Sequence, residues 1–298
     1  MQEDNNLEIL LKQMQKFYKP KKDKKTWFVG SVFMFGVLYL VLGLDIFTIL
    51  MLVVVLVVHE VGHLVAMKFF GYEDVGIMFT PIGAVTIGYK ENKTALEEFV
   101  VALMGPLPGI LLSIGIWVYL STNLMINDQL MLVLQSYAFI SLAMNYINLL
   151  PIYPLDGSRI LHALLLHKYP KGQFYFYVVS MAILVVEIVL LRDYILGILL
   201  FVMAVGFYQH KAIASTLSQV LKDKTISTKE QVASFILNRY PNYSIDKKAN
   251  IASMVWSVLS MKKPNGFLLI GGMGLYLFLL LPFIVFFGFG FYYFTNLH

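Results

Sequence analysis

The sequence contains no cysteine and very little charge. Without Cys among its 298 residues, disulfide bonds are excluded and any metal site must be built from His, Asp or Glu. Only 14% of the residues are charged, whereas 58% are hydrophobic and 15% aromatic. Soluble domains carry about 25% charged residues. The shortage of charge therefore excludes a water-soluble or disordered chain and leaves a polytopic membrane protein.

Apolar runs long enough to cross a bilayer of about 30 Å recur along the chain. They predict an all-α polytopic membrane protein with six to seven transmembrane helices. The seven candidate spans are 27–43, 46–70, 96–120, 130–150, 174–191, 194–208 and 267–294.

The polar stretches between these runs suggest four parts. They are a cytoplasmic Lys-rich N-terminal segment (1–26), a transmembrane domain (27–210) with a core at about 46–166, a small cytoplasmic helical region (211–264), and a C-terminal transmembrane helix (265–298). In the third part, apolar spacing predicts two short amphipathic helices, over 230–240 and 249–261.

The basic residues predict the orientation. If the N-terminus is cytoplasmic, 22 of the 23 Lys and Arg lie on the cytoplasmic side and only Arg192 lies outside. Positive residues accumulate in cytoplasmic loops. The net charge of +5 therefore indicates topology rather than nucleic-acid binding. We expect contact with the lipid bilayer, no nucleic acid partner, and a cytoplasmic N-terminus; the oligomeric state is left open.

Two histidines and a glutamate interrupt the second apolar run. His59, Glu60 and His63 form an HExxH pattern. Residues four apart lie on one face of a helix, so both imidazoles can reach one metal ion. An ionisable side chain at bilayer depth costs about 2.5–3.5 kcal/mol, which argues that Glu60 is functional. The alternative is that the three side chains only hydrogen-bond between helices.

A third ligand is needed from another segment, because catalytic zinc takes three protein ligands and leaves one position open. Asp156 is the best candidate. Near it Pro151 and Pro154 interrupt any helix, and Gly157 is expected to permit an unusual backbone turn. Irregular backbone at membrane depth lines a wet cavity or is buried in protein. The alternative is that Asp156 caps the helix that follows it.

Together the two motifs resemble those of the site-2 protease family of intramembrane zinc metalloproteases. The HExxH pattern and the NxxPxxPLDG pattern of residues 148–157 occur in the order, separation and membrane context of that family's three-helix catalytic core. The resemblance implies one Zn²⁺ per chain held by His59, His63 and Asp156, with Glu60 as general base on zinc-bound water. It also implies regulated intramembrane proteolysis, in which peptide bonds in or near transmembrane segments are hydrolysed.

The resemblance gives roles to two further regions. Residues 71–93 correspond to a membrane-dipping β-hairpin, in which Gly83 and Val85 are expected to contact an extended substrate by strand addition. A cytoplasmic turn without substrate contact is the alternative. Asn148 is expected in the active site, where it would hold substrate or the oxyanion.

Other features set the chain apart from larger family members. It has no PDZ-like insertion and so resembles the small members that process sporulation factors. Those members often end in a CBS domain, which is not recognisable in 211–264. The last apolar run is an addition to the family's usual six-helix layout. The resemblance suggests a bacterial cell membrane with the active-site opening on the cytoplasmic side. Gly105 and Gly109 form a GxxxG pattern that we expect to serve close helix packing.

Two other functions remain as alternatives. A non-proteolytic membrane metal transporter or scaffold could use the same metal-binding residues. A prenyl-protein-type membrane metalloprotease also has HExxH, but its third ligand is a Glu in a different motif. Under the favoured hypothesis the partner is a transmembrane protein or membrane-bound peptide substrate, whose identity the sequence does not give.

Overall fold

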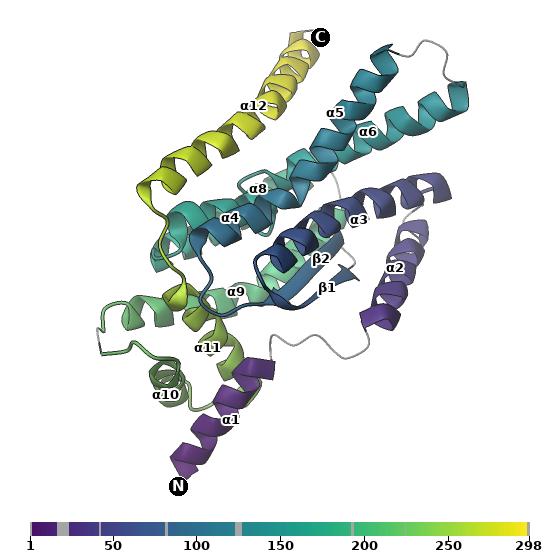
Figure 1. The fold of residues 1–298 in the computed structure, drawn as a ribbon. Coiled ribbons are helices and arrows are strands. Elements are labelled where there is room, and N and C mark those ends of the chain that lie inside the picture. Colours follow the sequence, from purple (N-terminus) through teal and green to yellow (C-terminus); the bar gives the residue numbers. More distant parts are fainter. Residues whose placement is uncertain are drawn as a thin grey trace.

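The computed structural model describes residues 2–16, 24–41, 43–80, 83–122, 127–191, 194–223 and 225–296 (Figure 1). Arg192 and the hairpin turn at 81–82 lie outside these residues. The elements in chain order are α1 Gln2–Lys16, α2 Lys24–Val41, α3 Ile46–Phe69, β1 Glu73–Thr80, β2 Gly83–Tyr89, α4 Ala95–Met104, α5 Pro106–Thr122, α6 Asp128–Asn148, α7 Asp156–Leu161, the π-helix η1 His162–Leu166, α8 Pro170–Leu191, α9 Tyr194–Val220, α10 Lys229–Arg239, α11 Ile245–Ser260 and α12 Gly266–Asn296.

Five stretches of helix in the described residues are long and apolar enough to span a membrane. They are Ile46–Phe69, Ala95–Thr122, Asp128–Asn148, Pro170–Leu190 and Leu196–Val220. Two shorter apolar helices, Phe28–Val41 and Gly266–Pro282, coincide with the other two predicted spans. The predicted polytopic helical membrane fold is confirmed, and the chain is an integral membrane protein.

Local sequence signals set the limits of the helices that matter for the site. The Asp45 side chain accepts a hydrogen bond from the Thr48 amide at 3.0 Å and begins α3. Thr94 and Glu97 form a capping box that begins α4. The apolar run predicted as one span over 96–120 is two consecutive helices, α4 and α5. Pro106 opens α5, as expected for a residue that lacks the amide proton.

The predicted β-hairpin is present as an antiparallel pair. Strands β1 and β2 pair from Thr80 opposite Gly83 to Glu73 opposite Tyr89, with an irregularity near the open end. One side of the pair is engaged by α2, since the Phe79 amide donates to the Ser31 hydroxyl at 3.0 Å. Strand β2 packs against α3 (Figure 1). The hairpin thus lies directly beside the helix that carries HExxH.

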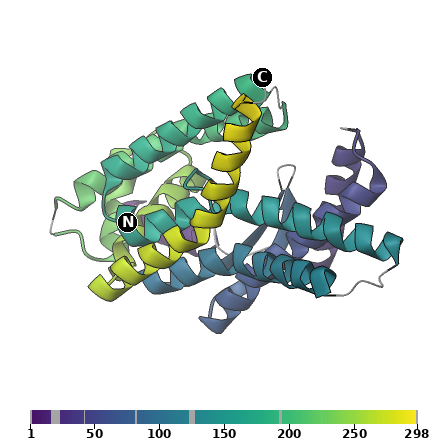
Figure 2. The same ribbon diagram turned by 90° about the horizontal axis from the view of Figure 1, so that it is seen from above.

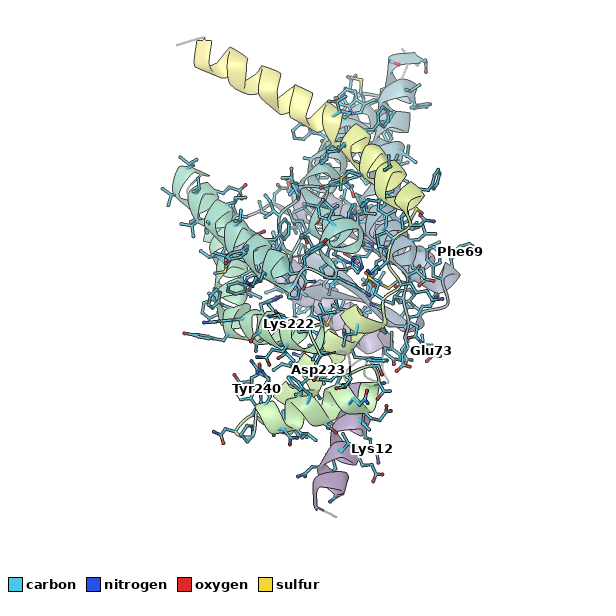
Figure 3. The ribbon with its side chains drawn as sticks, turned by 90° about the vertical axis from the view of Figure 1, so that its left-hand side faces the viewer. Lys12, Phe69, Glu73, Lys222, Asp223 and Tyr240 are labelled. Atoms are coloured by element: carbon cyan, nitrogen blue, oxygen red, sulfur yellow. The ribbon has the colours of Figure 1, made fainter. Side chains whose placement is uncertain are left out.

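A separate hydrophobic cluster lies below the membrane helices. It is formed by α1, residues 211–220 of α9, α10 and α11, which we call the small bundle (Figures 1 and 3). The two amphipathic helices predicted in this region are confirmed as α10 and α11. Two details differ from the expected division of the chain. Helix α1 packs into the bundle through Leu10 and Met14, and the expected boundary at residue 210 falls inside the continuous helix α9.

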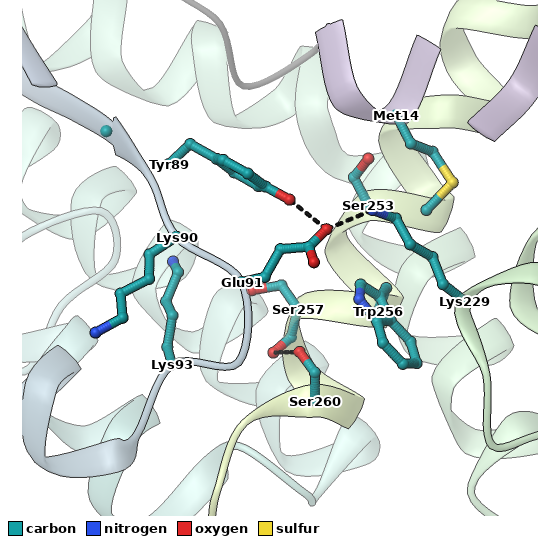
Figure 4. Close-up of a pocket in the computed structure, with 11 residues that line it drawn as sticks. Met14, Tyr89, Lys90, Glu91, Lys93, Lys229, Ser253, Trp256, Ser257 and Ser260 are labelled. Atoms are coloured by element: carbon teal, nitrogen blue, oxygen red, sulfur yellow. Dashed lines mark hydrogen bonds and ion pairs between the residues drawn. The ribbon is translucent and has the colours of Figure 1, made fainter. Parts of the chain in front are cut away.

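The small bundle is joined to the end of the hairpin. Lys229 at the start of α10 pairs with Glu91 at 2.5 Å, and the Tyr89 hydroxyl donates to the same carboxylate (Figure 4). The Lys262 backbone accepts from the Ala95 amide at 3.2 Å and donates to the Lys93 carbonyl at 3.0 Å. The loop between β2 and α4 is therefore held by the bundle.

Helix α12 covers the core from another side. In Figure 2 it crosses the molecule with α8 and α9 on one side and α5 and α6 on the other. Its Tyr276 hydroxyl donates to the Leu149 carbonyl at 2.7 Å, and both residues are buried. This contact holds the chain just before the Pro-rich segment that leads to Asp156.

Candidate metal centre

The two histidines of α3 meet as their spacing predicts. His59 and His63 are one helical turn apart and each is 3% exposed. Their Nε2 atoms lie 3.2 Å from each other. Both rings therefore present a ligand atom to the same point inside the protein.

Asp156 completes this cluster from a distant part of the chain. Its Oδ2 lies 3.0 Å from Nε2 of His59 and 3.1 Å from Nε2 of His63. Helix α7 begins at Asp156 itself, so the alternative that Asp156 caps this helix is wrong. Gly157 brings two segments close together: a Cβ there would lie 2.1 Å from the Leu149 carbonyl oxygen. That close approach, rather than the unusual turn we expected, explains the glycine.

A hydrogen bond places a proton on Nδ1 of each imidazole, the ring nitrogen that faces away from Asp156. His63 Nδ1 lies 2.7 Å from the Val101 carbonyl, which can only accept, so Nδ1 carries the proton. His59 Nδ1 lies 2.8 Å from Oδ1 of Asn145. The amide of Asn145 cannot be reversed, because its Nδ2 donates to the Ser141 carbonyl at 2.7 Å. In its neutral form each imidazole therefore directs the Nε2 lone pair at the cluster.

Two Nε2 atoms and one Asp156 oxygen therefore lie about 3 Å from one another. With both imidazoles neutral, all three atoms are acceptors and a cation among them removes their repulsion; with an imidazole protonated, its Nε2 donates to Asp156 instead. Three ligand atoms with second partners on both imidazoles are the arrangement of a catalytic metal site. The residues therefore fit a metal ion, and the alternative, that these side chains only hydrogen-bond between helices, stays open.

Glu60 lies beside this cluster with a different set of contacts. The ligand atoms of His59, Glu60 and His63 all lie within 4.8 Å of one another, which by itself would also allow Glu60 to be a ligand. However, Glu60 Oε2 accepts a hydrogen bond from the Thr86 hydroxyl at 2.6 Å, and Asp156 is closer to both imidazoles. This geometry favours Asp156 as the ligand and leaves Glu60 as a neighbouring carboxylate.

The junction of α4 and α5 forms one wall of the site. A Cβ at Gly105 would lie 2.2 Å from Nε2 of His63 and 2.9 Å from Nε2 of His59. A Cβ at Gly109 would lie 2.2 Å from Nδ2 of Asn145. The close packing expected of the GxxxG pattern is confirmed. It takes place against the metal-site residues, a role that we did not predict.

A chain of charges extends away from Asp156. Its second oxygen, Oδ1, lies 3.3 Å from Nη1 of Arg159, and Nη2 of Arg159 lies 3.9 Å from Glu98. Glu98 in turn pairs with Lys93 at 2.8 Å. Burial, with Glu98 nearby, raises the pKa of Tyr72 well above its ordinary value, so the phenol remains neutral. Arg159 thus faces the side of the Asp156 carboxylate that is turned away from the imidazoles.

The remaining predicted site residues lie close by but have other contacts. Asn148 is at the end of α6, where its Nδ2 donates to the Met144 carbonyl at 3.0 Å. Gly83 begins β2, and a Cβ there would lie 3.9 Å from Leu56 of α3. Val85 is 37% exposed, on the strand that carries Thr86. Substrate contacts by Asn148, Gly83 and Val85 stay predictions.

Sequence reasoning missed Asn145 and Thr86. Asn145 is one turn before Asn148 and forms with Ser141 an i, i+4 polar pair in the second half of a candidate membrane span. That pair is a signal that could have identified Asn145. Thr86 lies in an ordinary β-prone run, and no local pattern distinguishes it. Both residues are buried, at 0% and 7% exposure.

Comparison with known proteins gives concordant matches. The model of Peptidase family M50 matches residues 47–127 and 121–187. Stage IV sporulation protein FB of Bacillus subtilis is 30% identical over 122 residues, 41% of this chain and 41% of that protein. A zinc metalloprotease of Methanocaldococcus jannaschii is 32% identical over 120 residues, 40% of this chain and 34% of that protein.

A solved structure is also similar. The site-2 protease from Methanocaldococcus jannaschii aligns with a TM-score of 0.47 and 25% identity, covering 60% of this chain and 87% of that chain. The chain spans about two fifths or less of the length of the curated relatives it matches. The matched part of the chain includes His59, His63 and Asp156.

Proposed function

We propose that this chain, whose residues 47–187 match the model of Peptidase family M50, is an intramembrane zinc metalloprotease of the site-2 type. The observation that carries the proposal is the convergence of two imidazole nitrogens from a candidate membrane span and one carboxylate oxygen of Asp156, each about 3 Å from the others. His59, His63 and Asp156 would hold one Zn²⁺. The name of the similar Methanocaldococcus jannaschii protein, a zinc metalloprotease, supports this choice of metal.

The chemistry divides between the metal and Glu60. A bound zinc ion would lower the pKa of the water molecule that it binds and would polarise the scissile carbonyl. Glu60, next to the ligands, would accept the proton of the attacking water and deliver it to the leaving amine. Thr86 would hold the Glu60 carboxylate in place through its hydroxyl at 2.6 Å. Asn145 and the Val101 carbonyl would keep the imidazoles in the ligating tautomer.

The hairpin supplies a route for an extended substrate to reach Glu60. On β1, the Phe79 amide is hydrogen-bonded to α2. On β2, Thr86 contacts Glu60. Its neighbours Val85 and Ile87 point to the other face of the strand and are 37% and 40% exposed. A substrate strand added along β2 would lie close to the general base. Gly83 and Val85 would contact that strand, and Asn148 would lie at its far side.

The substrate would be a transmembrane protein or membrane-bound peptide, unwound locally so that its backbone can pair. The basic residues support a cytoplasmic N-terminus, small bundle and active-site opening. Similarity to a Bacillus subtilis protein supports a bacterial cell membrane. We propose that 27–210 is the protease domain, with 211–264 and 265–298 added to it.

The natural absence of cysteine permits a clean test of this orientation. Lys222→Cys and Gln129→Cys place single thiols on the small bundle and at the start of α6. In intact cells, a membrane-impermeant maleimide should label the second variant only. Labelling of Lys222→Cys instead would invert the topology.

The function is tested by comparing cells that express the wild type and Glu60→Gln. New protein N-termini inside or beside transmembrane segments should appear in wild-type cells only, while the purified variant keeps its zinc. A wild type that binds zinc yet yields no Glu60-dependent termini would refute the proposal. Zinc flux into liposomes that is equal for both proteins would favour a transporter, and Glu60-dependent cleavage restricted to prenylated peptides would favour the prenyl-protein type.

A further inference from the structure

Three basic side chains gather where two membrane helices begin. His167 and Lys168 lie between η1 and α8, and Lys263 lies just before α12. Helix α12 packs on η1, where Leu164 and Leu268 belong to one hydrophobic cluster. The two loops are therefore neighbours although they are far apart in sequence. Lys263 lowers the pKa of Lys168, in addition to the effect of burial, because the two ammonium groups repel each other.

These groups have no counter-charge in the part of the chain that the structure describes. Neither Lys168 nor Lys263 forms an ion pair or side-chain hydrogen bond there, in contrast to Lys229, which pairs with Glu91. His167 is only 6% exposed, and both of its ring nitrogens lack a partner. A buried imidazole without partners is unfavourable unless something outside the protein binds it.

The surroundings favour an anion at a membrane surface. Helices α8 and α12 both begin here, so their positive dipole ends add to the basic side chains. Tyr169, which directly follows Lys168, is 68% exposed, and Phe267, four residues after Lys263, is 87% exposed. Exposed aromatic residues at the ends of spans are typical of the membrane–water interface.

We propose that His167, Lys168 and Lys263 form a binding site for the phosphate of an anionic phospholipid headgroup. The two lysines pair with the phosphate, and a small shift of the loop that carries His167 brings one of its covered ring nitrogens into hydrogen-bonding contact with the same phosphate. Tyr169 and Phe267 contact the lipid beyond the headgroup. A bound lipid would connect the start of α8 to the start of α12, close to the segment that carries Asp156.

The test uses the full-length chain in detergent, titrated with phosphatidylglycerol, with bound lipid counted by native mass spectrometry. We expect Lys168→Gln/Lys263→Gln to weaken binding about 30-fold, from the contribution of each basic residue near an anionic surface. Lys12→Gln/Lys222→Gln is the matched control. It removes two positive charges from exposed positions, one on α1 and one just after α9 (Figure 3), and should leave the affinity unchanged.

A third variant tests the imidazole. His167→Phe should weaken phosphatidylglycerol binding while the melting temperature without lipid stays equal or rises, because it removes unpartnered buried nitrogens. Equal losses in the cluster and control variants would overturn the proposal in favour of diffuse attraction. Full competition by inorganic phosphate, or equal binding of phosphatidylcholine, would overturn the anionic-lipid assignment.

Discussion

Replacing Gly105 with Ala tests whether the junction of α4 and α5 shapes the metal site. The added Cβ would lie 2.2 Å from Nε2 of His63, whereas ordinary van der Waals contact begins at 3.4 Å. The imidazole ring of His63 or the junction of α4 and α5 must therefore move by at least 1.2 Å. Gly105 has φ −67° and ψ −65°, which alanine adopts freely, so the effect arises from contact and not from backbone strain. Metal–ligand distances tolerate about 0.2 Å.

We therefore expect Gly105→Ala to lose at least about 100-fold in zinc affinity, the upper end for changes to residues that only orient ligands. The assay is zinc content after equilibration in metal buffers, with cleavage measured on the same samples. The control is Gly115→Ala in α5, where a Cβ would meet nothing within 4 Å. Circular dichroism and melting temperature without metal show whether each variant is folded. A folded Gly105→Ala with wild-type zinc affinity would refute the geometry described above.

Three further predictions concern the neighbours of the site. Thr86→Val should lower kcat about tenfold or more with zinc content unchanged, because Glu60 loses a charge-assisted hydrogen bond. Thr86→Ser keeps the hydroxyl and should restore activity. Equal cleavage rates of the two variants would contradict this role of Thr86. Asn145→Ala should lower zinc affinity about 10–100-fold, measured by competition with a chelator, and unchanged affinity would show that the imidazole needs no partner. The hydrogen bond from Lys229 lowers the pKa of Glu91. The ion pair therefore stabilises the folded protein at pH values above the ordinary carboxylate pKa, and this stabilisation is lost as the pH falls through the lowered pKa. Glu91→Gln should remove that part of the pH dependence in melting experiments between pH 7 and about pH 3, and an identical profile would refute it.

The sequence was most informative where the interactions are local. A helix places residues four apart on one face whatever surrounds it, so HExxH determined that His59 and His63 would meet. Apolar run length and the distribution of Lys and Arg depend on the bilayer rather than on packing, and they gave the membrane helices. The hairpin was expected from the family resemblance of residues 71–93. Its packing against α3 could not be predicted from the sequence.

Only the tertiary structure decided the surroundings of these side chains. The contacts of His59 with Asn145, of His63 with Val101 and of Glu60 with Thr86 join residues 86, 38 and 26 positions apart. No periodicity connects such positions, because the packing of separate helices and strands sets these distances. That packing explains why Asn145, and not Asn148, holds an imidazole.

Gly105 illustrates the same division. The sequence by itself determined a GxxxG pattern, and hence a close approach of helices. Which groups approach depends on the angle at which α4 and α5 cross α3, a property of the whole core. Short-range geometry thus determined the chemistry available to this protein, and long-range packing decided which atoms are close enough to use it.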